Sequence, residues 1–415
     1  MVAMLAWSLF SRRLQRWHVT GPVALVGCGI AVGFFFADQI MLGLDTDIAE
    51  PIVELILAVL LFVDATEVRG GYLGGQHGLV ARLLGIALPL SLVLAVLVGI
   101  PLLGIPVLDA PSLAITALVA LVVVPVDFAP AANFLRDRVI PRRLRNALAV
   151  ESGYADAIRA PIFAFLLVIA ESPDESHTLW ELLGHAVPDI VFAVVAGAGV
   201  GALAGVLARV ALRRGWVQLH GLRISAVLIP IVTYAVAVGL HGNGFVAAFI
   251  AGITYRLIRA RGTATERERH EVALREELSL IESVGELASL LMWFVFGTVV
   301  SVVFLLAVDW SLILYGLLAL TLLRSIPVQL SMLGSGLHFR ERSALGFMGP
   351  RGTSTIVFGL LAFNAIETTD AVIVLYAMVV TVLASVILHG LFGTLISRGI
   401  VGRRAEAVEA RDDAV

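Results

Sequence analysis

The sequence predicts an all-α polytopic membrane protein with about 13 transmembrane helices. Its 415 residues are 59% hydrophobic and 15% charged, whereas a soluble chain carries about 25% charged residues. Apolar stretches of roughly 17–25 residues, the length that crosses a bilayer, recur along nearly the whole chain. Arginines and acidic residues alternate between the ends of successive stretches, as in a chain that crosses a membrane repeatedly.

Each apolar stretch is predicted to form one membrane span, and the eighth and ninth are separated by a single tight turn at 241–244. The predicted spans are 2–11, 20–37, 51–67, 81–104, 111–131, 145–170, 187–209, 222–240, 243–257, 280–307, 310–331, 345–363 and 370–397. Residues 262–279 are charged and form either a helix at the inner membrane surface or a solvated linker. Gly197, Gly201 and Gly205 recur at four-residue spacing and predict a face for close helix packing.

The charges at the span ends test this division. Arginines follow the odd-numbered spans, for example Arg142 and Arg143 after the fifth, and no arginine follows an even-numbered one. The positive-inside rule therefore places the N-terminus outside and the C-terminus, with a short tail at 401–415, in the cytoplasm. All 29 basic residues are arginine, a usage that suggests a GC-rich bacterial genome and a location in the bacterial cell membrane.

Several ionisable residues fall inside the predicted spans. Each costs at least ~2.5–3.5 kcal/mol at mid-bilayer, so each needs a partner or a function. They are Arg159, Arg324, Arg351, Asp64, Asp127, Glu151, Asp156 and, nearer a span end, Glu286. At about 100° per residue, Ser152, Asp156 and Arg159 lie on one face of the sixth span. A buried carboxylate on that face can hold a proton or a cation but holds both poorly, which is the minimal chemistry of proton-coupled exchange.

Two spans contain residues that break a helix. Pro125 and Pro130 flank Asp127 in the fifth span, and Gly349–Gly352 reads Gly-Pro-Arg-Gly in the twelfth. Proline leaves backbone carbonyls without a partner, and such backbone is tolerated in a membrane where protein or a water-filled cavity satisfies it. Spans 1–6 and 8–13 form two six-helix repeats of inverted topology. Paired broken helices in inverted repeats indicate the ion site of a transporter.

The chain resembles bacterial monovalent cation:proton antiporters of the sodium/proton exchanger family over nearly its whole length. The segments that carry the resemblance are Leu61-Phe62-Val63-Asp64-Ala65, Pro141-Arg142-Arg143 leading to Glu151-Ser152, Gly242-Asn243-Gly244-Phe245-Val246-Ala247-Ala248-Phe249, Trp293-Phe294-Val295-Phe296-Gly297 and Gly349-Pro350-Arg351-Gly352.

The resemblance implies roles for individual residues. Asp156 resembles the ion-binding aspartate of the family's Asn-Asp pair, with Glu151 and Ser152 as neighbours on the same helix. Asp127 resembles the aspartate of the Thr-Asp pair in the first broken helix. Arg351 resembles the arginine that pairs with the residue matched by Glu151. The family also implies a homodimer with a scaffold (about 1–70 and 222–307) and a transport core (about 81–170 and 310–397), within a single exchanger domain (1–400).

The sequence departs from the family pattern at the site. Val126 stands for the threonine, Ala155 for the asparagine, and Arg159 for an uncharged residue. Two oxygen-bearing side chains are lost and one positive charge is gained, although hard cations bind through several oxygens. Arg159 could be the counter-ion of Asp156, or it could pair with Asp127 and leave Asp156 to bind ions.

The sequence therefore predicts secondary active antiport of Na⁺ or K⁺ against H⁺. Asp156 would carry the ion with help from Ser152, Asp127 and the backbone at Val126, and Glu151 with Arg351 would form a structural charge pair. The alternative is an exchanger fold that has lost ordinary cation exchange and moves another solute or acts as a sensor or partner. Since no metal-ligand spacing, nucleophile motif or nucleotide loop stands out, we expect no enzyme, no cofactor, no resident metal and no nucleic-acid partner.

Overall fold

The computed structural model describes residues 2–15, 20–36, 49–67, 76–106, 109–128, 140–170, 179–261, 264–305, 308–366 and 370–391. Within these ranges all regular structure is helical, as the sequence predicts. Seven helical segments in them are long and apolar enough to cross a membrane: 77–102, 142–170, 188–213, 219–239, 272–304, 310–331 and 370–389. Four shorter apolar helices accompany them. The chain is thus a multi-pass membrane protein, while the count of 13 and the inverted repeats stay predictions.

Helices occur within each predicted span, although their ends differ from the predicted ones and α16 lies mostly outside any predicted span. In chain order they are α1 (Val2–Gln15), α2 (Gly21–Phe35), α4 (Ala49–Glu67), α5 (His77–Arg82), η1 (Leu83–Ala87), α6 (Leu88–Leu102), α7 (Ala110–Val123), α9 (Arg142–Ala170), α10 (Leu179–Arg213), α11 (Leu219–Gly239), α12 (Gly244–Arg259), α13 (Ala264–Phe304), α14 (Trp310–Leu320), α15 (Leu322–Ser331), α16 (Phe339–Phe347), α17 (Thr353–Ala365), α18 (Asp370–Ser385) and η3 (Val386–Leu391).

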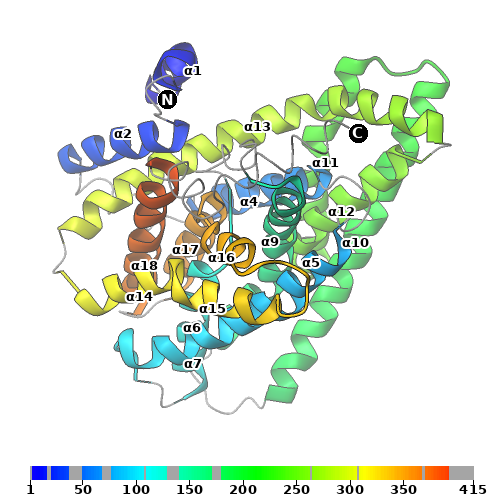
Figure 1. Cartoon of the computed structure of the whole chain (residues 1–415). Coiled ribbons are helices and arrows are strands. Elements are labelled where there is room, and N and C mark those ends of the chain that lie inside the picture. Colours follow the sequence, from blue (N-terminus) through cyan, green and yellow to red (C-terminus); the bar gives the residue numbers. More distant parts are fainter. Residues whose placement is uncertain are drawn as a thin grey trace.

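Small residues bring pairs of helices into close contact. A Cβ added to Gly197 would lie 2.4 Å from the carbonyl oxygen of Ala247, and one on Gly201 would lie 2.6 Å from that of Ala251. The predicted packing face of α10 is therefore confirmed, and its partner is α12. Gly297 brings α13 equally close to α2, and Figure 1 shows these two helices crossing along one side of the molecule.

Two connections near the middle of the chain refine the prediction. His241 has a φ of +58°, and the Asn243 side chain caps α12 by accepting from the N–H groups of Phe245 and Val246. The single tight turn at 241–244 is thus confirmed. Of the segment at 262–279, the part from Ala264 on is helical, because α13 begins at Ala264 and continues unbroken through the following span.

The contacts between helices fall into two groups. The first contains α2, α4, α10, α11, α12 and α13, and the second contains α6, α7, α9, α14, α15, α17 and α18. Figure 1 shows α10, α11 and α12 gathered on one side and α7, α14 and α15 on another. The helix α10, which the prediction left outside both regions, packs with the first group. The division into scaffold and transport core stays a prediction.

Both predicted helix breaks are confirmed. The first falls at Pro125, just after α7 ends at Val123, because proline has no N–H with which to continue the helical hydrogen bonds. The second lies between the end of α16 at Phe347 and the start of α17 at Thr353, around Pro350. A third break, which was not predicted, separates α14 from α15 at Thr321. Pro130 and the tail 401–415 lie outside the described residues.

Candidate functional site

The two interrupted segments cross and bond to each other. The Asp127 N–H donates to the carbonyl of Pro350 at 2.9 Å. The Asp127 carboxylate accepts from the Ser354 N–H at 2.9 Å and from the Ser354 hydroxyl at 3.1 Å. Since the first N–H groups of a helix have no partner within it, a carboxylate is favoured at this end. Asp127 therefore caps α17 from a distant part of the chain.

Gly352 makes this crossing sterically possible. A Cβ at this position would lie 2.6 Å from Cγ of Asp127, closer than real Cβ contacts come. Any larger residue must push the aspartate off the α17 N-terminus. The glycine of the Gly-Pro-Arg-Gly motif is thus required for a close approach between side chain and backbone.

We expect Gly352→Ala to destabilise the protein by about 1–3 kcal/mol, the usual cost of overpacking a tight site. The measurement is the midpoint of unfolding in detergent micelles. Gly199→Ala is the matched control, because a Cβ on Gly199 meets nothing within 4 Å. The control should be neutral or slightly stabilising, since alanine favours a helix. Equal midpoints for the wild type and Gly352→Ala would show that the crossing widens freely.

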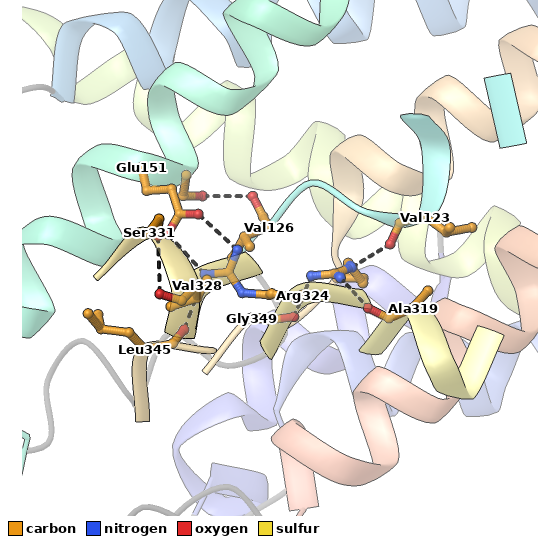
Figure 2. A network of polar contacts seen from close by, with 11 residues as sticks. Val123, Val126, Glu151, Ala319, Arg324, Val328, Ser331, Leu345 and Gly349 are labelled. Atoms are coloured by element: carbon orange, nitrogen blue, oxygen red, sulfur yellow. Dashed lines mark hydrogen bonds and ion pairs between the residues drawn. The ribbon is translucent and has the colours of Figure 1, made fainter. Parts of the chain in front are cut away.

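Arg351 holds the broken ends of two helices. Its Nε donates to the carbonyl of Val123 at 2.5 Å, its Nη2 to that of Ala319 at 2.9 Å and its Nη1 to that of Gly349 at 2.6 Å. Val123 and Ala319 belong to the last turns of α7 and α14, where carbonyls lack helical partners. The side chain is fully buried, and Figure 2 shows the carbonyls of Val123 and Ala319 converging on one guanidinium.

The predicted pair between Glu151 and Arg351 is wrong, because Glu151 pairs with Arg324. The two Arg324 Nη atoms donate to the two Glu151 carboxylate oxygens at 2.8 and 2.9 Å. Figure 2 shows this fork beside Val126. Arg351 instead donates to backbone carbonyls of the interrupted helices. A sequence pattern does not reveal such acceptors. A bidentate pair also fixes geometry more firmly than a single contact.

Arg324→Met should destabilise the protein by about 3–5 kcal/mol, because it leaves the buried Glu151 carboxylate without its partner. The midpoint of unfolding in detergent micelles measures the effect. The exposed Arg340→Met serves as control and should stay within about 0.5 kcal/mol of wild type. Adding Glu151→Gln to Arg324→Met should recover part of the loss. No recovery would mean that the two residues do not act as a pair.

A further chain of contacts, from the end of α18 and from η3, holds the segment at the second break. The Arg351 N–H donates to the Ser385 hydroxyl at 2.7 Å, and this hydroxyl lies 3.3 Å from Nδ1 of His389. His389 Nε2 lies 3.0 Å from the carbonyl oxygen of Phe347, the last residue of α16. The segment between α16 and α17 is thus held from both of its ends.

Asp156 and Arg159 form an ion pair in the interior. Arg159 Nη2 donates to Oδ1 of Asp156, and both side chains are almost wholly buried. The guanidinium carbon of Arg159 lies 4.1 Å above the ring of Phe358 in α17, a cation–π contact. Nε and Nη1 of Arg159 have no hydrogen-bond partner among the described residues. Of the two predicted alternatives, Arg159 is the counter-ion of Asp156.

Acidic and polar groups from three segments surround this pair. The charges of Asp127 and Asp64 act on Arg159 in addition to that of Asp156. The Asp156 carboxyl is faced by Arg159, Asp127 and Ser354. The carboxylates of Asp156, Asp127 and Asp64 therefore contribute negative charge at the point where Asp156 and Arg159 meet.

The other predicted site residues lie beside this point. The Ser152 hydroxyl donates to the carbonyl of Val126 at 3.3 Å. The Val126 side chain is buried in a cluster of apolar side chains. Because valine has no side-chain oxygen, only the backbone carbonyl of this residue can bind a cation. Ala155 is also buried and offers a methyl group. The structure brings together Ser152, Asp156, Asp127 and Val126, and places Glu151 in a separate charge pair.

Three residues of the site were missed by the sequence-based assignment of roles. Arg324 was noted as an arginine inside a span, but nothing in the sequence chose its partner. Ser354 is the second residue after the Gly-Pro-Arg-Gly motif, and its place at the start of a helix was the available signal. Phe358 gave no signal, because an apolar residue in a span is expected to pack.

The site offers oxygen ligands and one competing cation. Carboxylates, hydroxyls and carbonyls are the donors that hard cations prefer. Among the described residues, no group of three or more His, Cys, Asp or Glu side chains is arranged to hold a metal ion. Arg159 occupies one oxygen of the Asp156 carboxylate, so a cation binding there would compete with it.

A comparison with family models and a comparison with solved structures both find sodium/proton exchange proteins. The model of the family described as sodium/hydrogen exchanger, transmembrane, matches residues 1–398. A solved structure of the sodium proton antiporter MjNhaP1 from Methanocaldococcus jannaschii at pH 8 is similar, with a TM-score of 0.74 at 18% identity over 97% of both chains. An electron-microscopy structure of that antiporter gives a TM-score of 0.71 at 19% identity, covering 97% of this chain and 96% of the other. At these identities the likeness shows a shared fold.

Proposed function

This chain belongs to the sodium/hydrogen exchanger family, a family of transporters, and we propose that it exchanges Na⁺ or K⁺ for H⁺ across the cell membrane, with Asp156 binding the cation and the proton in turn. The observation that carries the proposal is the position of Asp156. Its carboxyl is buried beside the crossing of two interrupted helices and faces Asp127 and Ser354. A single carboxylate that holds one cation at a time makes cation and proton compete.

The remaining ligands follow from the same geometry. We propose Ser152, Asp127 and the carbonyl of Val126 as the further oxygen ligands. Ser152 lies about one helical turn from Asp156 and its hydroxyl donates to the Val126 carbonyl, while the charge of Asp127 acts on Asp156. Glu151 with Arg324 and Arg351 with its three carbonyls stabilise the backbone that carries these oxygens. Holding the ligands on braced backbone keeps their spacing constant as the site loads and unloads.

Transport by alternating access is part of the proposal. The helices that carry the site, α7, α9 and α17, pack with α18 and the other helices of the second group. We expect this transport core to move against a scaffold formed by the first group, in a homodimer. Such motion carries a site at a helix crossing from one side of the membrane to the other without unfolding the crossing.

The test is cation-induced proton movement in proteoliposomes or everted vesicles, titrated with Na⁺, K⁺ and Li⁺ from mildly acidic to mildly alkaline pH. Wild type should show exchange for at least one of these ions. The order of the ions then identifies the substrate. Absence of exchange for all three, in protein shown to be folded by its unfolding midpoint, contradicts the proposal.

One observation favours a second candidate function. Arg159 already neutralises Asp156 inside the protein, and Val126 and Ala155 supply no side-chain oxygen. A chain with this site could have lost ordinary cation exchange and serve another solute, or act as a sensor or partner. Under this second function the wild type shows no exchange, and exchange appears only when the arginine is removed.

A further inference from the structure

Close packing of α10 on α12 brings two arginine-rich helix ends together. The packing face continues to Gly205, where an added Cβ would lie 3.0 Å from Cγ2 of Ile258. Arg209 stands one helical turn beyond Gly205, and Arg259 directly follows Ile258. Because the glycines let the two backbones approach, the helix ends that carry these arginines lie close together.

Like charges meet at this point. The positive charges of Arg213 in α10 and of Arg259 and Arg261 at the end of α12 act on Arg209. Arg259 is compensated by Glu277, whose carboxylate it contacts with Nη2 at 2.5 Å and with Nε at 3.2 Å. Arg209 has one buried nitrogen, Nη2, without a hydrogen-bond partner among the described residues. Buried guanidinium nitrogens are normally satisfied, so this cluster is suited to an acceptor from outside the chain.

The cluster lies where a lipid headgroup would lie. It stands at the end of the membrane-spanning part of α10, which runs to Arg213. Just beyond, Arg214 stacks 4.7 Å over the ring of Trp216, and Trp216 is 68% exposed. Tryptophan with its polar edge at the headgroup level is typical of a membrane interface.

An apolar surface leads to the cluster along α10. Val195, Leu203 and Val206 are exposed and lie on the same face of the helix as Arg213. The distribution of arginines predicts that this end faces the cytoplasm, where the inner leaflet carries anionic lipids. Acyl chains along this stripe would bring a phosphate group to the arginines.

We propose that Arg209, Arg213 and Arg261 form a binding site for the phosphate headgroup of an anionic phospholipid, whose acyl chains lie along the exposed face of α10. Arginine forks bind phosphate oxygens in pairs, which gives the site geometric selectivity over simple charge attraction. The site belongs to the first group of helices, away from Asp156. The proposed lipid site therefore does not depend on whether the protein exchanges cations.

Native mass spectrometry of the full chain in detergent tests the proposal, with titration of phosphatidylglycerol, phosphatidylethanolamine and inorganic phosphate. Wild type should bind phosphatidylglycerol in preference to phosphatidylethanolamine, and the same lipid should raise its unfolding midpoint. Arg209→Gln with Arg213→Gln should weaken phosphatidylglycerol binding at least about tenfold. Arg142→Gln with Arg340→Gln removes the same charge from exposed positions elsewhere and should leave binding unchanged.

Three results would overturn the lipid site. Equal losses in the two double variants would mean attraction by charge alone. Equal response to inorganic phosphate would mean a site for a free anion, and loss of lipid binding as the protein dimerises would mean that a second copy covers this face. If the glutamine variant does not fold, Arg209→Lys with Arg213→Lys keeps the charge but loses the fork, and should bind phosphatidylglycerol more weakly than wild type.

Discussion

Replacing Asp156 with asparagine is expected to abolish cation-induced proton movement. Asparagine has nearly the same shape but cannot carry a negative charge or a titrating proton, so the competition between cation and proton disappears. The measurement is the proton movement that follows addition of Na⁺ or K⁺ to proteoliposomes. The expected signal is that of protein-free liposomes at every pH between mildly acidic and mildly alkaline.

Two controls keep this result interpretable. Asp309→Asn retains a side chain that caps α14 and lies far from the site in the chain, so its transport should equal wild type. Asp156→Asn leaves Arg159 without its ion-pair partner, and this could destabilise the fold. Combining Asp156→Asn with Arg159→Leu removes both charges and should give a stable but inactive protein. Exchange retained by that stable double variant would rule out Asp156 as the carrier.

Replacing Arg159 with leucine is expected to lower the apparent KM for the transported cation by about tenfold or more. Two unit charges about 4 Å apart interact by about 4 kcal/mol at an effective dielectric constant of about 20. Each 1.4 kcal/mol corresponds to about tenfold in affinity, so even a fraction of this repulsion is readily measured. Removing the tethered guanidinium frees the Asp156 oxygen that it occupies.

A binding measurement made separately from transport shows whether the lower KM of Arg159→Leu comes from tighter cation binding. The cation should raise the unfolding midpoint of Arg159→Leu more than that of wild type at the same concentration, since a ligand stabilises the state that binds it. Arg159→Lys keeps the charge and should resemble wild type. An unchanged KM and an unchanged midpoint shift in Arg159→Leu would show that the arginine does not compete with the cation.

A double variant that includes Arg159→Leu separates the two candidate functions. If wild type shows no exchange for any cation, Arg159→Leu together with Ala155→Asn restores the apolar and oxygen-bearing residues of the family pattern. Exchange gained in that variant favours a fold whose native site has given up cation exchange. Exchange present in wild type and lost with Asp156 favours the antiporter.

Local chemistry made much of the fold predictable. Apolar length indicated the spans, and Pro125 and Pro350, each of which lacks the N–H of a helical hydrogen bond, indicated the breaks. The small-residue face of α10 was predictable for the same reason, since spacing along one helix decides which residues share a face. These features depend on a few consecutive residues.

The charged residues that need partners were also evident from the sequence alone, because an ionisable group in a span is costly without one. The choice of partner was decided only by tertiary structure. Arg324 and Glu151 are 173 residues apart, and Arg351 reaches the ends of two helices that the chain breaks at separate places. Such pairings depend on how helices cross, and the crossing depends on packing over the whole molecule. The sequence determined which groups must be satisfied, and the tertiary structure determined which group satisfies each.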